Sequence, residues 1–319
     1  MPPSGPVDLS VIVPFYNERE NLEELYRKVA AVLPSLKLSY EIILVDDGSS
    51  DGGYELLARL AANDSRLKII RLTRNFGQTA ALSAGFKAAT GRLYVTLDAD
   101  NQNDPADIPL LLEKMKEGFD VVSGWRKNRH DALLTRKIPS WIANYLISRV
   151  TGVPLKDYGC TLKVYKAEFV DAFNLYGEMH RFIPAYAKMA GATITEIPVN
   201  HFPRLKGKTK YGLSRVFKVM LDLMTVKFLG SFATKPLYLF GTIGMVMNGS
   251  ACVIGAYVLY QKYGLGIFAH RNPLLLLAVF LSVLGFLFIM MGLLAELLMR
   301  TYHESQGKSI YIIREKVNF

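Results

Sequence analysis

The chain has 319 residues and a formal net charge of +10, and half of its residues are hydrophobic. The positive charge would suit a nucleic acid, but no nucleic-acid-binding motif is present, and basic residues beside apolar segments more often meet lipid headgroups or phosphate ligands. We therefore expect a membrane as partner and no nucleic acid, and we expect no disulfide because Cys160 lies in the polar part and Cys252 in an apolar run.

The first two hundred residues alternate strand-like and helix-like segments. Strands rich in Val, Ile, Leu or Tyr are predicted at Leu9 to Val13, Glu41 to Val45, Leu67 to Leu72, Leu93 to Leu97 and Asp120 to Ser123. Helices are predicted to begin near Glu18, Gly53, Gln78 and Pro105, the last with Asp104 as its N-cap. This alternation predicts an α/β domain over residues 1–210 with a mostly parallel sheet wrapped by helices.

Polar residues follow three of these strands, as "PFYNE", "VDDGSSD" and "LDADNQ". Ligands of parallel sheets bind at the C-terminal ends of the strands, so the three clusters predict one polar site. Asp98 and Asp100 stand two positions apart in an extended segment, which points both side chains to the same side, where they repel unless a cation lies between them. With the amide oxygen of Gln102 they suit Mg2+ or Mn2+ bound to a diphosphate.

Two later segments are predicted to be amphipathic helices, at about 134–150 and at 211–235. The first has Leu134, Tyr145 and Leu146 on its apolar side and Arg136 and Asn144 on its polar side. Such basic helices can lie in the headgroup plane of a membrane. Packing against the soluble domain is the alternative that the sequence leaves open.

No charged residue occurs from Leu237 to Tyr260 or from Asn272 to Ala295, and each run gives about 36 Å of helix. We expect a transmembrane hairpin within 236–300, with helices at 237–260 and 273–299; a pair of buried core helices is the alternative. Lys and Arg concentrate outside the hairpin loop, which predicts that both termini and the α/β domain are cytosolic. We expect no secretory signal in "MPPSGPVDLS".

The tail at 301–319 contains "KSIYIIREKVNF", which predicts a short strand that extends the sheet of this chain or of a neighbour. We expect a homo-oligomer.

The segments "SVIVPFYNE", "EIILVDDGSSDGG", "RNFGQTAALSAGF", "LDADNQNDP", "DYGCTLKVYK" and "FPRLKGKTKYGLSR" occur in an order that resembles glycosyltransferase family 2. The residues of these segments are similar to those of the polyisoprenyl-phosphate glycosyltransferases in that family. These enzymes include the dolichol-phosphate mannosyltransferases and the bactoprenol glucosyltransferases. The resemblance runs from about Leu9 to Ser214 and continues in the two-span anchor. It implies a GT-A, Rossmann-like nucleotide-sugar domain.

The resemblance also implies roles for the three polar clusters. The nucleoside is expected to contact Pro14, Tyr16, Asn17, Glu18, Asp46 and Asp47. Asp98 is expected to hold the ribose or the metal, and Asp100 the metal. Gln78 and Asn75 either line the nucleotide or cap a helix. Lys208 and Lys210, beside Gly207 in "RLKGKTKYG", are expected to neutralise the leaving diphosphate; a glycine linker with solvated lysines is the alternative.

The acceptor side must attract a phosphate carried on a lipid. "GWRKNRHDALLTRK" supplies Arg126, Arg129 and Arg136, and guanidinium groups suit phosphate oxygens. By resemblance, Arg126 and Arg136 bind the lipid phosphate; solvated surface charges are the alternative.

Asp157 is expected near the reacting groups, at a sheet edge, where it orients the acceptor, binds the sugar or accepts a residual proton; a structural ion pair is the alternative. A strong base is hardly needed, because a phosphate monoester with a second pKa near 6 is already largely dianionic at neutral pH. His180 and Arg181 match a family segment or pack at a helix start.

These features predict a metal-dependent, inverting polyprenyl-phosphate glycosyltransferase, with UDP-glucose as donor and undecaprenyl phosphate as acceptor. GDP-mannose with dolichyl phosphate is the second interpretation, and a non-catalytic nucleotide-sugar-binding scaffold is the third. A lipid glycosyltransferase that acts on a hydroxyl group would need a base and no arginine cluster. A processive polysaccharide synthase is disfavoured because the sequence has no Gln-x-x-Arg-Trp segment.

Overall fold

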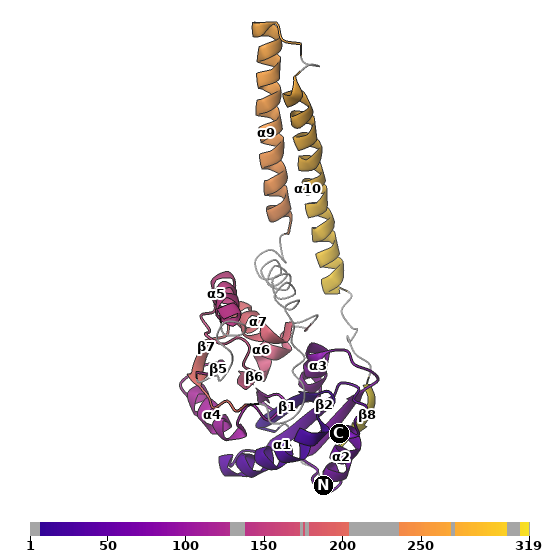
Figure 1. The fold of residues 1–319 in the computed structure, drawn as a ribbon, viewed down its shortest axis with the longest axis vertical. Coiled ribbons are helices and arrows are strands. Elements are labelled where there is room, and N and C mark those ends of the chain that lie inside the picture. The colour runs from indigo at the N-terminus through magenta and orange to yellow at the C-terminus, as the bar shows by residue number, and fades with distance from the viewer. Residues whose placement is uncertain are drawn as a thin grey trace. The chain divides into compact units, whose positions relative to one another are not determined.

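The computed structural model describes residues 7–127, 138–172, 175, 179–203, 236–268, 272–304 and 313–318. The chain divides into two compact units, Met1–Met224 with Ser309–Phe319, and Thr225–Lys308. The first unit holds a sheet and its helices, and the second holds two long helices (Figure 1). The amphipathic helix predicted at 211–235 lies outside the described residues.

The described strands of the first unit form one sheet in the order β7-β5-β6-β4-β1-β2-β3-β8. Their bounds are β1 Leu9–Phe15, β2 Tyr40–Asp46, β3 Leu67–Leu72, β4 Leu93–Thr96, β5 Val121–Trp125, β6 Lys163–Lys166, β7 Ile194–Pro198 and β8 Ile313–Val317. The pairs β1/β2, β1/β4, β2/β3 and β5/β7 are parallel, whereas β4/β6, β5/β6 and β3/β8 are antiparallel. The predicted α/β fold with a mostly parallel sheet is confirmed.

The helices of this unit connect the strands. They are α1 Arg19–Val32, η1 Leu33–Leu36, α2 Gly53–Ala61, α3 Gln78–Ala88, η2 Pro105–Asp107, α4 Ile108–Lys116, α5 Ile138–Thr151, α6 Ala167–Asp171, η4 Met179–Arg181 and α7 Ile183–Met189. Asp104 caps η2, as predicted, because its side chain accepts from the backbone N–H of Ala106.

The core lies on both faces of the central strands. Every residue of β1 is buried. Val11 and Val13 belong to a cluster with Leu22 of α1 and Leu57 of α2. Ile12 points the other way, because neighbouring side chains of a strand alternate between faces, and it touches α3 at Gly85. Burial on both faces explains why β1 and β2 are apolar along most of their length.

The tail strand is confirmed, and it extends the sheet of its own chain. β8 pairs antiparallel with β3, and the side chain of Asn318 donates to the carbonyls of Ala61 (3.0 Å) and Leu67 (2.8 Å). Asp157, expected at a sheet edge, precedes β6, which is an interior strand of the sheet. β6 lies between β5 and β4, because both neighbours pair with it antiparallel.

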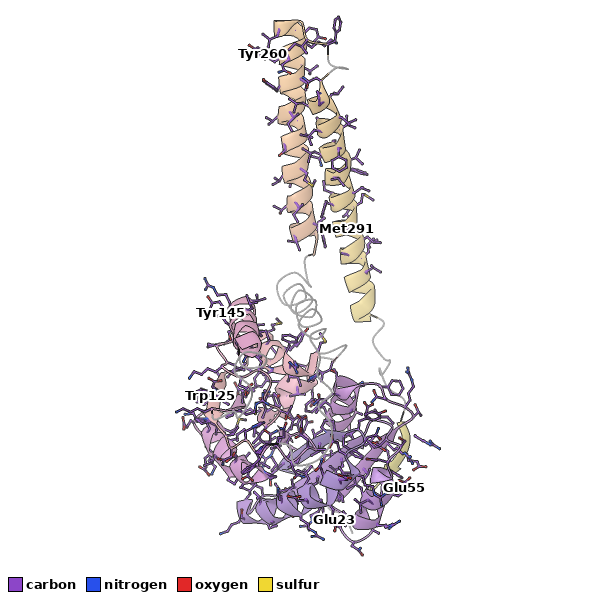
Figure 2. The ribbon with its side chains drawn as sticks, in the orientation of Figure 1. Glu23, Glu55, Trp125, Tyr145, Tyr260 and Met291 are labelled. Carbon is purple, nitrogen blue, oxygen red and sulfur yellow. The ribbon has the colours of Figure 1, made fainter. Side chains whose placement is uncertain are left out.

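The second unit contains α9 (Pro236–Leu265) and α10 (Pro273–Glu304), which include the two predicted spans. Leu239–Leu265 and Pro273–Ala295 are long and apolar enough to cross a membrane. Their most apolar windows are only 17% and 11% buried, which does not fit the alternative of core helices. Figure 2 shows their side chains, including Tyr260 and Met291, around the outside of the hairpin.

The two helices approach closely at small residues. A Cβ on Gly244 would come within 2.5 Å of the carbonyl oxygen of Gly285. The hydroxyl of Ser282 donates to Oδ1 of Asn248 (3.3 Å) at the same level. Close backbone approach with a polar contact is a common way for helices to associate in lipid, which offers no hydrophobic drive of its own.

Candidate functional site

The three polar strand ends predicted from the sequence meet in one cleft of about 230 Å³. They meet because β4, β1 and β2 are neighbouring parallel strands, so their carboxyl ends share one edge of the sheet. Of the predicted site residues, the cleft is lined by Pro14, Tyr16, Glu18, Asp47, Asn75, Gln78, Asp98 and Asp100.

Asn17 and Asp46 organise the first two strand ends instead of lining the cleft. Asn17 accepts from the backbone N–H of Ser50 (3.0 Å) and donates its own N–H to the hydroxyl of Ser49 (2.9 Å). Asp46 is fully buried, and its Oδ1 accepts from the N–H of Ser49 (2.7 Å). Burial raises the pKa of Asp46 despite that bond. Both residues therefore fix the loop that follows β2.

Asp47 shapes the cleft from the second strand end. Its Oδ1 accepts from the N–H of Phe76 (2.7 Å), and its Oδ2 from the N–H of Gly77 (2.9 Å). This carboxylate holds the turn that leads into α3. Gln78 then occupies the first turn of α3, and its amide donates to Oδ1 of Asp98 (2.8 Å). The side chain of Gln78 thus reaches another strand end, and a contact with the nucleotide stays a prediction.

Asp98 and Asp100 follow β4 and lie close enough to affect each other. Burial and the charge of Asp100 together raise the pKa of Asp98 to about 6. Among the described residues, no three Asp, Glu, His or Cys side chains gather as a complete metal site. Two carboxylates are nevertheless the donor set with which proteins hold Mg2+ when substrate phosphates and water complete the shell. The mutual repulsion and the donor chemistry therefore fit a divalent cation.

Gln102 is half-buried, and its backbone N–H donates to Oδ1 of Asp100 (3.2 Å). This contact orients Asp100. The role of the Gln102 side chain as a metal ligand stays a prediction.

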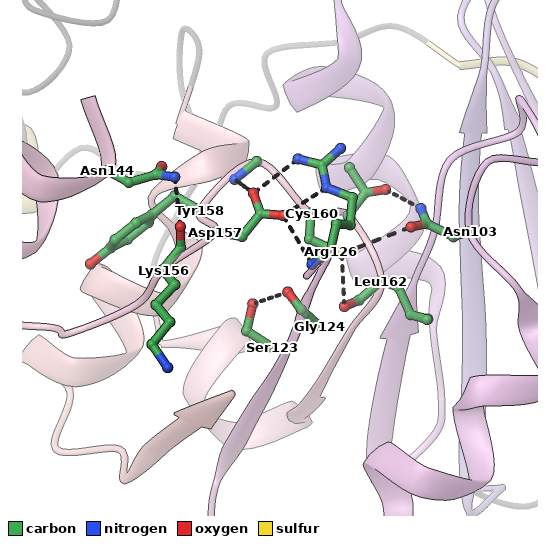
Figure 3. Close-up of polar contacts among 12 residues, drawn as sticks. Asn103, Ser123, Gly124, Arg126, Asn144, Lys156, Asp157, Tyr158, Cys160 and Leu162 are labelled. Atoms are coloured by element: carbon green, nitrogen blue, oxygen red, sulfur yellow. Dashed lines mark hydrogen bonds and ion pairs between the residues drawn. The ribbon is translucent and has the colours of Figure 1, made fainter. Parts of the chain in front are cut away.

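Arg126 and Asp157, which the sequence assigned to different roles, form a two-pronged ion pair (Figure 3). Nε of Arg126 lies 2.7 Å from Oδ2 of Asp157, and Nη2 lies 2.9 Å from Oδ1. The side chains are 14% and 4% exposed. Paired N–H groups facing two carboxylate oxygens give a strong and directional contact. Arg126 follows β5 and Asp157 precedes β6, so pairing of these strands brings the two together.

Gly159 leaves room for this pair. A Cβ at that position would lie 2.9 Å from Nη2 of Arg126, so a side chain there would push against the guanidinium. The backbone N–H of Gly159 also donates to Oδ1 of Asp157 (3.1 Å). The "DYG" segment thus supplies both the carboxylate and the space that the arginine needs.

A narrow recess of about 30 Å³ adjoins the cleft and shares Pro14, Gln78 and Asp98 with it. His180 and Arg181 line the recess, and Nδ1 of His180 is 2.9 Å from the hydroxyl of Thr79. Burial, and then the charge of Arg181, lower the pKa of His180 to about 3.

Lys163 of β6 also lines the recess and is 3% exposed. The sequence analysis missed this residue. The sequence does contain a signal for it, a lysine between the apolar Leu162 and Val164. Burying a charged side chain inside a strand is costly, so such a residue usually has a function.

The remaining predicted residues lie outside the described part of the chain. They are Arg129, Arg136, Gly207, Lys208 and Lys210.

Comparisons with known proteins agree with the fold and the motifs. The pattern of glycosyl transferase family 2 matches residues 10–173. The dodecaprenyl-phosphate galacturonate synthase of Rhizobium johnstonii is 42% identical over 98% of this chain and 94% of that protein. The undecaprenyl-phosphate 4-deoxy-4-formamido-L-arabinose transferase of Salmonella dublin is 40% identical over 97% of this chain and 93% of that protein.

A solved structure of glucosyl-3-phosphoglycerate synthase from Mycobacterium tuberculosis, in complex with Mn2+ and UDP-glucose, has a related fold. The TM-score is 0.52 at 15% identity, over 70% of this chain and 79% of that chain. At this identity the likeness concerns the fold alone. The family match and the relatives over nearly the whole length are decisive, and the chain belongs to glycosyl transferase family 2.

Proposed function

We propose that the protein transfers a sugar from a UDP-sugar to a polyprenyl phosphate at the cytosolic face of a membrane. The observation that carries the proposal is the nearness of two sites: the Asp98–Asp100 cleft and the Arg126–Asp157 pair, in which the guanidinium of Arg126 is close enough to Asp98 for their charges to interact. A nucleotide-sugar site beside an arginine suits a reaction between a diphosphate donor and a phosphate acceptor. The two relatives that are 40% and 42% identical are named as polyprenyl-phosphate sugar transferases.

The donor nucleotide would occupy the cleft. Tyr16 offers an aromatic face, and Glu18 a carboxylate for the ring N–H of uracil. Asp98 and Asp100 would hold Mg2+ or Mn2+, which supplies positive charge for the departing diphosphate. The M. tuberculosis protein of related fold was solved with Mn2+ and UDP-glucose, so this fold can hold a divalent cation together with a UDP-sugar.

The acceptor phosphate would meet Arg126. Asp157 engages Nε and Nη2, which leaves Nη1 for a phosphate oxygen, since none of the described residues accepts a hydrogen bond from Nη1. A phosphate monoester is largely dianionic at neutral pH, so its oxygen can attack the anomeric carbon without a strong base. Asp157, with both oxygens facing the guanidinium, suits the role of orienting Arg126. Attack opposite the diphosphate inverts the anomeric centre and gives a β-linked product.

The membrane would present that acceptor. The α9–α10 hairpin supplies two apolar spans, and the distribution of Lys and Arg supports cytosolic termini. α5 offers a second contact: Tyr145 is 68% exposed and Leu146 41%, whereas Asn144 and Ser148 bond to the carbonyls of Lys156 and Leu155. In the described part of α5, Asn144 and Ser148 face the domain while Tyr145 and Leu146 are exposed, which supports the interfacial interpretation over the packing one. Tyr145 lies at the periphery of the first unit (Figure 2).

The sugar has three candidates. The sequence favours glucose, whereas the named relatives transfer galacturonate and 4-deoxy-4-formamido-L-arabinose. GDP-mannose with dolichyl phosphate and a non-catalytic scaffold are less well supported by these relatives.

The test is transfer of radiolabel into the organic phase, using purified protein in detergent with Mn2+ and undecaprenyl phosphate. Donors would be UDP-glucose, UDP-galacturonate, the UDP-formamido-arabinose sugar and GDP-mannose. We expect label from a UDP-sugar with wild type and none with Asp100→Asn. Transfer only from GDP-mannose would overturn the choice of nucleotide, and nucleotide binding without transfer from any donor would favour the scaffold.

A further inference from the structure

The recess beside Asp98 contains a buried lysine without a carboxylate partner. Nζ of Lys163 donates to the carbonyl oxygens of Tyr158 (3.4 Å) and Cys160. Among the described residues, no carboxylate oxygen lies within the 4.0 Å ion-pair limit of Nζ. The nearby Asp157 is engaged by Arg126. An ammonium group carries three N–H donors, so two carbonyls leave one for a ligand.

Among the described residues, the other charged groups around the recess form no ion pair with Lys163. Arg181 adds a second positive charge, and His180, with its lowered pKa, is neutral near pH 7. Asp98 is the single carboxylate among the described lining residues, and it also faces the cation site. Burial lowers the pKa of Lys163 and the charges of Asp157 and Asp98 oppose this only in part, so an anionic group that arrives with the substrate would stabilise the charged form of this lysine.

The position of the recess indicates which part of the substrate arrives there. The recess meets the cleft at Asp98 and Gln78, so a sugar attached to a diphosphate at Asp98 and Asp100 lies beside its mouth. Its volume of about 30 Å³ is room for a group of a few atoms. A substituent on the ring can therefore enter the recess.

We propose that the recess binds the carboxylate at C6 of the donor sugar, with Lys163 as its direct partner and Arg181 as a supporting charge. The donor is then a UDP-uronate. A C6 hydroxymethyl group would fill the same space but leave the ammonium without a counter-charge. This inference rests on the proposed function, because it assumes a UDP-sugar in the cleft.

Calorimetric binding to the full-length protein in detergent with Mn2+ tests the proposal. UDP is compared with two pairs of donors that differ only at C6: UDP-galacturonate with UDP-galactose, and UDP-glucuronate with UDP-glucose. Wild type is expected to bind the uronate of at least one pair about tenfold or more tightly than its neutral twin, because a hydrogen bond to a charged group is lost in the twin. Lys163→Met is expected to remove this preference without changing affinity for UDP, and Lys163→Arg to restore part of it.

Lys166→Met is the matched control, since Lys166 stands on the same strand but pairs with Asp120. It should keep the full preference. UDP binding without any preference for a uronate in wild type would overturn the inference and leave the proposed function intact, as would a preference that persists in Lys163→Met. Failure to bind UDP itself would count against the proposed function, and the inference would fall with it. If Lys163→Met does not fold, the wild-type pairs and Arg181→Met carry the same test.

Discussion

The side chains of Arg126 and Asp157 act as one unit, with Nε to Oδ2 at 2.7 Å and Nη2 to Oδ1 at 2.9 Å in a largely buried position. The sequence suggested a phosphate ligand and a separate acidic group. Their pairing means that neither can be altered without changing the other. It also limits the freedom of the guanidinium, so that its remaining face has a fixed direction.

Removing Asp157 should therefore affect both stability and acceptor use. In Asp157→Ala the guanidinium of Arg126 stays buried without its partner, and we expect a loss of about 3 kcal/mol in the free energy of unfolding. Denaturant unfolding in detergent measures this loss. The double variant Arg126→Met with Asp157→Leu should regain much of the stability but not transfer, because no guanidinium remains for the phosphate. A double variant with wild-type activity would contradict the assignment of Arg126 to the acceptor.

The cation site predicts a selective loss in Asp100→Asn. Loss of a charged contact worth about 1.5–3 kcal/mol should weaken binding of UDP in the presence of Mn2+ about tenfold or more. Binding of UDP to wild type should fall similarly when EDTA replaces Mn2+. Asp104→Asn is the control: it lies close in sequence but caps η2, a role that Asn also fills. Equal effects of the two substitutions would argue against a metal at Asp100.

The helical hairpin should be sensitive to one glycine and not to another. Gly244→Leu places a side chain where a Cβ already meets the carbonyl of Gly285, and we expect overpacking to cost about 1–3 kcal/mol and separate the helices. Gly249→Leu on the same helix has nothing within 4 Å of its Cβ and should be tolerated. Cross-linking of cysteines introduced at Asn248 and Ser282 reports the separation. Similar cross-linking in both leucine variants would refute the close approach.

The open side of α5 predicts a defect in acceptor use alone. Tyr145→Glu puts a charge on the apolar surface, and the lost burial of one aromatic side chain should raise the KM for lipid phosphate about tenfold. The KM for the UDP-sugar should not change, and Tyr145→Phe should behave as wild type. Kinetics in vesicles with varied lipid phosphate provide the measurement. An increase in the donor KM instead would mean that α5 supports the cleft.

Much of the fold could be predicted because it depends on local patterns. The apolar runs of β1 and β2, buried on both faces, give the sheet, and the charge-free runs of α9 and α10 give the hairpin. The place of β6 could not be predicted, because its neighbours are set by antiparallel pairing with β4 and β5, which are far away in the sequence. The pairing of strands depends on the whole sheet and has no local signal.

The candidate site also contains some residues that could be identified from the sequence and others that could not. Asp98 and Asp100 could be identified from spacing alone, since two like charges on one side of a strand need a cation. The contact of Gln78 could not be predicted until α3 was placed against β4, where its amide meets Asp98. Lys163 looked like one more residue of a strand.

The sequence by itself determined the family, the parallel sheet, the acidic pair and the membrane hairpin, because each depends on residue type at short spacing. Only the tertiary structure decided that Arg126 pairs with Asp157, that Asp47 holds the turn before α3, and that Lys163 is buried in the recess beside Asp98 with no ion pair to a described residue. These relationships join segments that are brought together by strand order. Electrostatic and hydrogen-bond interactions act over a few ångströms in space, whatever the separation along the chain.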